Sequence, residues 1–265
     1  YALVLSDGGS VNGSELVRGM EEANTGKVPI TGGLAGDAAR FQTTLVGLNG
    51  PASSGRIVAV GFYGKDLVVE HSSVGGWEMF GPERKITRAI SNKLYEIDGR
   101  NALDLYKTYL GKYADDLPGS ALLFPLSVIL PGLDEPVVRT ILSIDPTDQS
   151  MVFAGDVPEG SRVRFMKANF DKIIDAATQA AHRTLSSPSK KNPKLALLIS
   201  CVGRKIILGN RVDEEVETIA DTFGADTFLT GFYSYGELSP LVRAKPCELH
   251  NQTMTITTLD ERPSA

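Results

Sequence analysis

The chain has 265 residues, of which 42% are hydrophobic and 22% are charged, and its net charge at pH 7 is −5. This length and composition are typical of a globular protein with one large domain or two smaller ones. The mild negative charge and the lack of a basic stripe argue against a nucleic-acid-binding surface, which needs lysine and arginine to neutralise phosphates.

The cysteine content and the apolar runs indicate the compartment. Cys201 and Cys247 are the only cysteines, and two so far apart favour a reducing cytoplasm over a disulfide scaffold. The longest apolar run, 121–130, contains Pro125 and falls short of the roughly 18 residues that span a bilayer. We therefore expect a cytoplasmic protein without membrane contact. Because Tyr1 opens directly on a strand pattern, without Met or signal peptide, we also expect a piece of a longer protein.

The first third of the sequence predicts alternating strands and helix. The predicted elements are a strand at 2–5, a helix at 15–23, a glycine-bearing loop at 31–37 and strands at 41–48 and 56–63. Ser14 is the expected N-cap of the helix, because a serine side chain can accept a hydrogen bond from a free helical N–H group. Asn49 and Gly50 suit the turn of a hairpin between the last two strands.

The middle third is more varied. The predicted elements are paired strands at 85–91 and 93–98, a helix at 102–110, strands at 137–144, 150–153 and 162–166, a helix at 170–185 and an exposed linker at 186–193. The helix at 102–110 follows from Leu103, Tyr106 and Leu110, whose spacing places them on one face.

The last third repeats the layout of the first. Its predicted elements are a strand at 195–200, a loop at 201–204, a helix at 213–222, a strand at 227–230 and a loop at 231–237. Thr31-Gly32 and Thr230-Gly231 take equivalent places, and Gln42-Thr43 and Gln252-Thr253 open equivalent strands. A duplicated strand-helix-strand unit predicts an α+β fold with a pseudo-symmetric, layered core of sheet and helices, in which the two loops face one another.

Several segments, taken in order, resemble the FIST domains. The C-terminal FIST domain is resembled by 97–106, 155–160, 197–204, 213–216, 231–238 and 249–255, and residues 1 to about 80, including 30–37, are similar to the later part of the N-terminal FIST domain. The resemblance implies a boundary between residues 1–82, from the FIST N domain, and 83–260, a FIST C domain. The beginning of the N-terminal domain has no counterpart, so any site to which it contributes is incomplete.

The resemblance implies a function in signal transduction. FIST domains are sensory input domains, found alone or attached to bacterial outputs such as histidine kinases and methyl-accepting proteins. The family is proposed to bind small ligands such as amino acids, and some members are linked to haem and nitric oxide sensing. We therefore expect a small-molecule ligand, held between the two duplicated halves, and a signalling output as partner.

The segment 233–237 is the most informative local pattern. Gly236 lets the backbone approach a ligand closely, Tyr233 and Tyr235 offer flat walls with hydroxyl tips, and Glu237 can accept a ligand's ammonium group. The alternative is a tight turn whose tyrosines pack on the core and whose acid caps a backbone group. The residues alone favour the turn, and the resemblance favours the ligand site.

Arg204 has two interpretations. A guanidinium group at the end of a buried strand can bind a carboxylate with two hydrogen bonds, and together with Glu237 it would clamp a zwitterion such as an amino acid. The alternative is a structural ion pair that closes the duplicated halves, with Glu214 or Glu215 as the partner. Both interpretations stay open at the level of sequence.

The histidines raise the question of haem. His250 and Asn251 precede a strand, and histidine can bind haem or metal or relay protons, although a lone histidine is more often structural. His71, near Trp77, is the other candidate haem ligand. A Cys-x-x-Cys-His motif is absent, and the three histidines and two cysteines have no zinc spacing. We expect no metal and no cofactor, with non-covalent haem as the alternative.

Enzymatic chemistry has little support in the sequence. Cys201 could act as a nucleophile with His250 as its base, but no Gly-x-Ser-x-Gly motif is present. The glycine-bearing segments 7–10 and 31–37 lack the Lys-Ser/Thr of a phosphate-binding loop. We expect that the chain is not an enzyme.

Four functions therefore compete: a sensor of a small ligand, a haem-based nitric oxide sensor, a thiol-dependent hydrolase or transferase, and a protein-interaction scaffold without ligand. The first is favoured. The predicted ligand-binding residues are Arg204, Tyr233, Tyr235, Glu237, His250, Asn251, Gly33 and Asp37.

Overall fold

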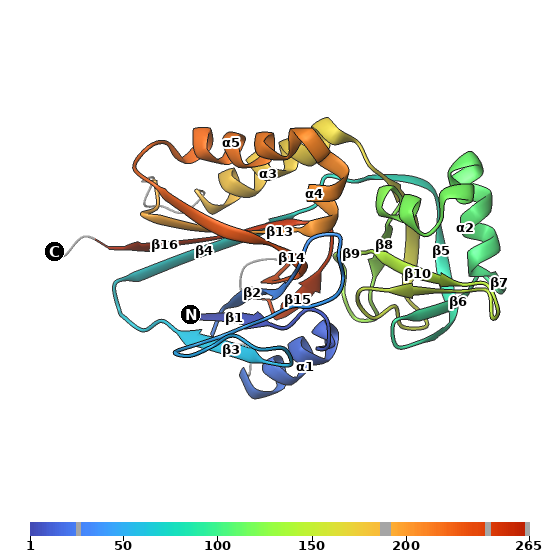
Figure 1. Ribbon diagram of the computed structural model, residues 1–265, viewed down its shortest axis with the longest axis horizontal. Helices are drawn as coiled ribbons and strands as arrows, with labels where there is room; N and C mark the ends of the chain where they lie inside the picture. The colour runs from blue at the N-terminus through green and yellow to red at the C-terminus, as the bar shows by residue number, and fades with distance from the viewer. Residues whose placement is uncertain (25–27, 186–191, 242–244, 263–265) are drawn as a thin grey trace. The chain divides into compact units, whose positions relative to one another are not determined.

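The computed structural model describes residues 1–24, 28–185, 192–241 and 245–262 (Figure 1). The chain forms two compact units: the first unit comprises 1–76 and 170–265, and the second unit comprises 77–169. Each unit contains its own sheet with helices, which confirms the α+β class. No helix among the described residues is long and apolar enough to cross a membrane.

The first unit is built on one sheet, which contains strands from both the beginning and the end of the sequence. Its strands are β1 (Ala2–Ser6), β2 (Ile30–Ala35), β3 (Ile57–Gly61), β4 (Leu67–Val74), β13 (Leu195–Cys201), β14 (Phe228–Pro240), β15 (Cys247–His250) and β16 (Met254–Glu261). Their order is β3-β1-β2-β14-β13-β16-β4, and β15 pairs with β14. Its helices are α1 (Gly13–Asn24), α3 (Phe170–Thr184), α4 (Val202–Leu208) and α5 (Val212–Phe223), with a 3₁₀ turn at Gly209–Arg211.

The predicted duplication is present in this sheet. In the first half, β1 and β2 are parallel and joined through α1, and β3 is antiparallel to β1. In the second half, β13 and β14 are parallel and joined through α4 and α5, and β16 is antiparallel to β13. The two halves meet where β2 and β14 pair antiparallel, so an approximate twofold axis relates them.

Two glycines mark equivalent points of the halves. Gly32 lies opposite Val4 in the register of β1 and β2, and Gly231 lies opposite Leu198 in the register of β13 and β14. A Cβ atom on Gly32 would lie 1.8 Å from the carbonyl oxygen of Val4, and one on Gly231 would lie 1.8 Å from that of Leu198. The same close approach therefore requires glycine in both halves.

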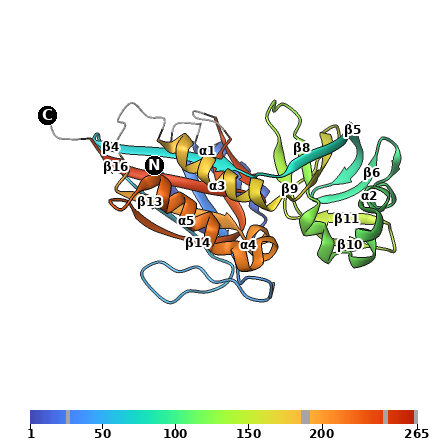
Figure 2. The same ribbon diagram turned by 90° about the horizontal axis from the view of Figure 1, so that it is seen from above.

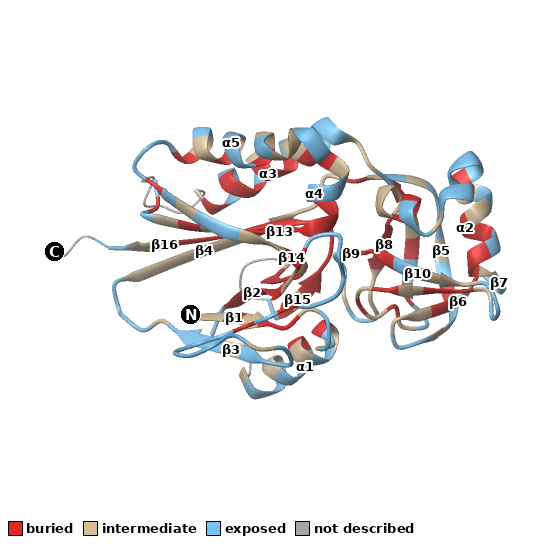
Figure 3. Ribbon diagram, viewed as in Figure 1, coloured by how far each residue is buried: buried red, intermediate tan, exposed pale blue. Residues whose placement is uncertain are grey.

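Helices cover one side of each half of the sheet. In the second half, α3 and α5 lie next to each other over β13 and β16 (Figure 2), where Ala177, Ile219 and Ile256 belong to one buried cluster. In the first half, α1 packs Val17 against Leu34 and Leu249. Burial follows these layers (Figure 3): β16 is largely buried, whereas β3 is exposed.

The second unit is a small domain with helices and its own sheet. Its elements are β5 (Glu78–Ile90), β6 (Lys93–Ile97), β7 (Arg100–Asn101), α2 (Ala102–Leu110), β8 (Leu126–Ile129), β9 (Val137–Arg139), β10 (Ile141–Asp145), β11 (Ser150–Phe153) and β12 (Arg162–Lys167), with 3₁₀ helices at Gly111–Asp116 and Gly119–Leu123. The strand order is β10-β11-β6-β5-β12-β8-β9, and β7 pairs with β6. The predicted pairing of 85–91 with 93–98 and the helix at 102–110 are confirmed.

Other local predictions are wrong. The segment 41–48 contains no strand apart from a single bridge between Val46 and Ser53, and β3 pairs with β1 rather than in a hairpin. The equivalence of Gln42-Thr43 with a strand opening therefore fails. Asn12, not Ser14, caps α1, because its Oδ1 accepts hydrogen bonds from the N–H groups of Ser14 and Glu15.

The predicted loops of the duplicated unit are also largely regular structure. Residues 31–35 lie in β2, 202–204 open α4, and 231–237 are part of the continuous strand β14. The predicted strand 137–144 is divided into β9 and β10. Most of the predicted linker 186–193 lies outside the described residues.

Candidate functional site

The ends of β2 and β13 converge on the middle of β14. Ser234 of β14 pairs with Cys201, the last residue of β13, and with Ala35, the last residue of β2. The register between β14 and β2 shifts between Ser234 and Gly236, as in a β-bulge. Bulges redirect side chains and are frequent beside functional sites. We call this place, where the two halves of the first unit join, the seam.

Glu237 lies at the seam, one register position beyond the bulge. It is opposite Gly33 of β2 and His250 of β15, and its side chain is 0% exposed. A Cβ atom on Gly33 would come within 2.8 Å of a methyl group of Ile199, so Gly33 leaves room for packing here. Gly33 and Glu237, both candidate ligand-binding residues, therefore lie opposite each other, in strands rather than in loops.

Hydroxyl groups surround the Glu237 carboxyl group. It accepts hydrogen bonds from the Ser234 hydroxyl, the Thr253 hydroxyl at 2.8 Å and the Thr253 backbone N–H at 3.2 Å. Burial raises its pKa to about 7, against these hydrogen bonds and the charge of Arg204, which lower it. Among the described residues, no ion pair includes Glu237. A buried carboxyl group without a paired cation is costly to ionise.

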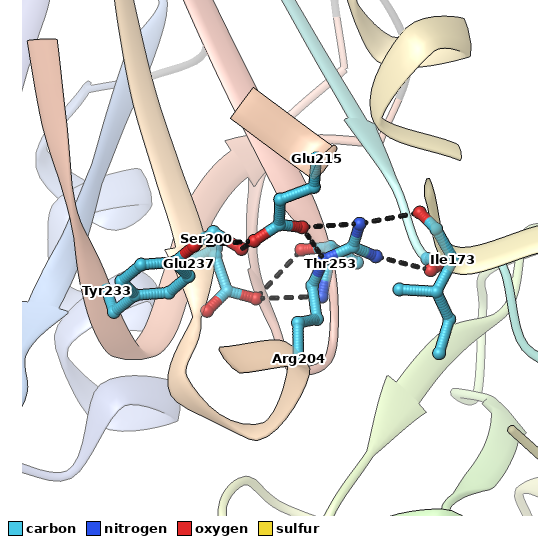
Figure 4. A network of polar contacts seen from close by, with 8 residues as sticks. Ile173, Ser200, Arg204, Glu215, Tyr233, Glu237 and Thr253 are labelled. Carbon is cyan, nitrogen blue, oxygen red and sulfur yellow. Dashed lines mark hydrogen bonds and ion pairs between the residues drawn. The ribbon is translucent and has the colours of Figure 1, made fainter. Parts of the chain in front are cut away.

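Arg204 forms the alternative ion pair, with Glu215 of α5, rather than a pair with Glu237 (Figure 4). Both side chains are 0% exposed, and the Arg204 Nη2 atom lies 2.9 Å from the carboxylate. Its Nε atom donates to the same carboxylate at 2.9 Å, Nη1 donates to the carbonyl oxygen of Gly75 at 2.6 Å, and Nη2 also donates to that of Ile173 at 2.7 Å. The guanidinium group thus holds α4, α5, the start of α3 and the end of β4 together, and no hydrogen bond or ion pair among the described residues joins Arg204 to Glu237.

Tyr233 joins the same network on the helix side of the sheet. Its hydroxyl group donates to Glu215 at 2.9 Å, and the Ser200 hydroxyl donates to the same oxygen at 3.1 Å. Burial raises the pKa of Tyr233, and the nearby Glu215 carboxylate adds to this effect. Tyr233 and Tyr235 are only two residues apart in β14, but their hydroxyl groups bind different parts of the protein.

Tyr235 contacts the loop that follows β2. Its hydroxyl group donates to Asp37, and its ring stacks on Phe41 with the ring centroids 4.9 Å apart. Asp37 also accepts from the backbone N–H groups of Phe41, Gln42 and Thr43. The N–H of Thr43 and then the hydroxyl of Tyr235 are the main reasons why the pKa of Asp37 lies far below its usual value. Asp37 thus organises residues 37–43 without strand pairing.

Asp7 holds the other side of the same loop. Burial by itself would raise its pKa, but hydrogen bonds from Gly55, Thr44, Gly9 and Ser10 outweigh this and hold the pKa far below the usual value. Thr44 and Gly55 lie at the two ends of the segment 44–55. The Asp7 carboxylate, directly after β1, therefore holds both ends of this segment. We call residues 36–56 the tethered loop.

The two alternative haem-ligand candidates, His71 and His250, lie on different strands. His250 is 3% exposed and its Nε2 atom lies 2.9 Å from the carbonyl oxygen of Ser239, whereas His71 lies in β4, opposite Thr257. Asn251 donates to the His250 carbonyl oxygen at 3.0 Å, and its Oδ1 atom is buried with no hydrogen-bond partner among the described residues. Those residues contain no group of three or more His, Cys, Asp or Glu side chains that could hold a metal ion.

The thiol of Cys201 is placed unfavourably for nucleophilic chemistry. It is 4% exposed, and burial, together with the nearby Glu237 carboxyl group, raises its pKa strongly. A thiol is reactive as its thiolate, which a raised pKa suppresses.

Sequence reasoning missed several residues of the seam. Ser234 and Thr253 supply the hydrogen bonds to Glu237, and Asp7 fastens the tethered loop. The Asp7-Gly8-Gly9-Ser10 segment is recognisable as a turn after a strand, in which an aspartate commonly accepts backbone hydrogen bonds. Ser234 and Thr253 carry no such signal, because their role depends on the pairing of strands far apart in sequence.

Two protein-family models match the chain, one after the other. The FIST N domain matches residues 1–100 and the FIST C domain matches residues 102–240, so the boundary between them falls inside the second compact unit. A search of curated proteins found no match. The C-terminal match alone covers more than half of the chain, and the order of the two matches agrees with the resemblance seen in the sequence. The chain belongs to the FIST family of sensory signal-transduction domains.

Proposed function

We propose that this sensory domain binds a small ligand with an ammonium group, of the amino-acid class, at the seam between the two halves of the first unit. The observation that carries the proposal is the Glu237 carboxyl group, which is fully buried without an ion pair among the described residues. Arg204, whose charge lowers the pKa of Glu237, is already paired with Glu215.

A ligand ammonium group would supply the missing positive charge. Removing a carboxylate from water without a counter-charge costs several kcal/mol, and a directly bonded cation compensates for much of that cost. The hydroxyl groups of Ser234 and Thr253 beside the carboxylate can hydrogen-bond further polar groups of a ligand. In this proposal Gly33, His250 and Asn251 border the ligand, and Asn251 offers its amide oxygen, which has no hydrogen-bond partner in the described part of the chain.

The fold offers a way to convert occupancy into a signal. Access to a buried carboxyl group requires movement of the surrounding strands or of the tethered loop, which Tyr235 links to β14. A ligand that binds only the opened arrangement shifts the equilibrium toward it, by an amount set by its difference in affinity for the two arrangements. An attached or partner signalling output would detect this change at the seam or at the loop.

A thermal-shift screen tests the proposal. Amino acids are compared at pH 8 with the corresponding hydroxy acids, which lack the ammonium group. A binding amino acid at about 100 times its Kd stabilises the folded protein by about 2.7 kcal/mol, and its hydroxy acid does not. Glu237→Gln should lose the shift, whereas Glu22→Gln, at an exposed position of α1, should keep it. If no amino acid raises the melting temperature, or Glu237→Gln responds like the unchanged protein, the proposal is wrong.

A further inference from the structure

The strand β3 forms an unusual edge of the first-unit sheet. It pairs with β1 on one side, and it is the terminal strand of the sheet among the described residues. Its sequence, Ile-Val-Ala-Val-Gly, is aliphatic, yet Ile57 is 51% and Val60 is 36% exposed. Native edge strands are usually protected from pairing by lysine, proline, a bulge or a covering element. Strand β3 itself contains no charged residue and no proline.

The backbone of β3 presents free pairing groups along its outer side. Phe62 donates its N–H to the Tyr1 carbonyl oxygen and Asp7 donates to that of Arg56. Because antiparallel pairs alternate, the N–H and C=O groups of Val58 and Val60 also point toward β1. Those of Ile57, Ala59 and Gly61 therefore point outward, away from β1.

The second half of the same sheet shows what takes this position. Strand β16 is the counterpart of β3, and β4 pairs antiparallel with its outer side. The equivalence of Gly32 and Gly231 aligns Ala59 with Ile256, because Ala59 faces Val4 and Ile256 faces Leu198. Ile256 faces Ser72 of β4. With β4 in place and α3 packed over it, β16 is buried along most of its length, whereas its counterpart β3 is exposed.

The charge around β3 defines the chemistry of a partner strand. Arg56 directly precedes β3, and Lys65 follows it with Asp66 as the next residue, in a chain whose net charge is −5. Both cations are exposed. The template strand β4 is aliphatic at Leu67–Val69 and acidic at Glu70, which complements such an edge.

We propose that the outer edge of β3 binds an antiparallel β-strand of a separate polypeptide, aliphatic with acidic residues, in the position that β4 holds against β16. Addition of a strand to an exposed edge gives affinity through main-chain hydrogen bonds and specificity through alternate side chains. For a sensory domain, such a strand is a direct connection to a signalling partner. The proposal is independent of the ligand at Glu237.

A labelled peptide with the sequence of residues 66–74 is the probe. Fluorescence anisotropy should show saturable binding to the whole chain, and a scrambled peptide should not bind. In hydrogen exchange, the amides of Ile57, Ala59 and Gly61 should slow by about tenfold or more on binding, while those of Val58 and Val60, already bonded to β1, should change little. A peptide with Glu70→Lys should bind more weakly.

Two variants of one residue provide the matched comparison. Ala59→Pro removes an outward N–H group without removing a bond to β1, and binding should be lost. Ala59→Ser keeps the N–H group, and binding should be kept. Circular dichroism shows whether both variants are folded. If Ala59→Pro does not fold, the hydrogen-exchange pattern of the unchanged protein still tests the proposal.

Three results would overturn the proposal. The first is a folded protein that does not bind the peptide. The second is protection along β16 instead of β3, which would mean that the peptide replaces the chain's own β4. The third is self-association of the chain that Ala59→Pro abolishes and the peptide does not compete with, which would assign the edge to a second copy.

Discussion

Glu237 illustrates how a few hydroxyl groups define the state of a buried carboxyl group. The Ser234 hydroxyl donates to Glu237 and also lies 3.3 Å from the Ser200 carbonyl oxygen. If Glu237 takes up a proton, its new O–H group can donate to Ser234, whose hydrogen can turn toward Ser200. Both protonation states are therefore satisfied without movement of the backbone. The charged or titratable groups near this site include Cys201, Arg204 and His250.

The raised pKa of Glu237 predicts a pH-dependent stability. The folded state holds the Glu237 proton more tightly than the unfolded chain, whose pKa is near 4.5. Stability is therefore highest below about pH 4.5 as far as this group is concerned, falls as pH rises to about 7, and is level above that. The whole change is about 3 kcal/mol. Urea unfolding of the unchanged protein and of Glu237→Gln across pH 5 to 8 should differ by this slope. Equal slopes in the two proteins would contradict the assignment.

At Arg204 the sequence left two interpretations open, and the structure contains the structural pair with Glu215. A strand-end arginine looks the same whether it awaits a ligand carboxylate or a carboxylate of its own chain. The difference depends on where α5 places Glu215, eleven residues later, and on the carbonyl groups of Gly75 and Ile173. The last two contacts arise only from tertiary packing.

Among the elements, helices were easier to predict than the strands of the seam. The apolar spacing of 102–110 correctly predicts α2, because one buried face dictates a helical period. The strands β2 and β14 contain glycines, which in a sequence normally indicate turns. Here Gly32 and Gly231 are required inside strands, since a neighbouring carbonyl oxygen occupies the space of a side chain. The glycines that close strand packing requires therefore resemble loop residues when only the sequence is considered.

The tethered loop depends on two carboxylates rather than on strand pairing, which explains why its predicted strand is absent. Asp37→Ala removes the acceptor for three backbone N–H groups and for the Tyr235 hydroxyl. We expect the loop to detach while the sheet stays folded, so limited trypsin digestion after Arg40 should become faster. The control is Asp66→Ala, outside the loop. Unchanged cleavage at Arg40 in Asp37→Ala would show that other contacts hold the loop.

For the whole molecule, the internal repeat was the most useful signal in the sequence. It correctly predicts that two strand-helix-strand units share one core, and the antiparallel pairing of β2 with β14 confirms their meeting. The division into two compact units is not visible in the sequence. The reason is that the whole second unit separates β4 from α3 in the sequence, yet α3 packs on β4 in the first unit. No local sequence pattern records such a distant contact.

The duplication predicts equal effects from equivalent substitutions. Gly32→Ala and Gly231→Ala would each place a methyl group against a carbonyl oxygen of the parallel neighbour strand. Overpacking of this kind typically costs about 1–3 kcal/mol, or more where the backbone cannot move. Both variants should be strongly and similarly destabilised in urea unfolding. Gly50→Ala, whose added carbon would meet no atom within 4 Å, is the control. A strong effect in one half and none in the other would disprove structural equivalence.

The central claim is that Glu237 receives the cationic group of a ligand, and proton release on binding tests it most directly. The amino acid identified by the thermal-shift screen is titrated calorimetrically at pH 7 in buffers of different ionisation enthalpy. Because the Glu237 pKa is about 7 in the free protein, a bound ammonium group should lower it and release about half a proton per ligand. Glu237→Gln should release none and bind more weakly. Tight binding with no proton release, and with the same affinity in Glu237→Gln, would contradict the claim.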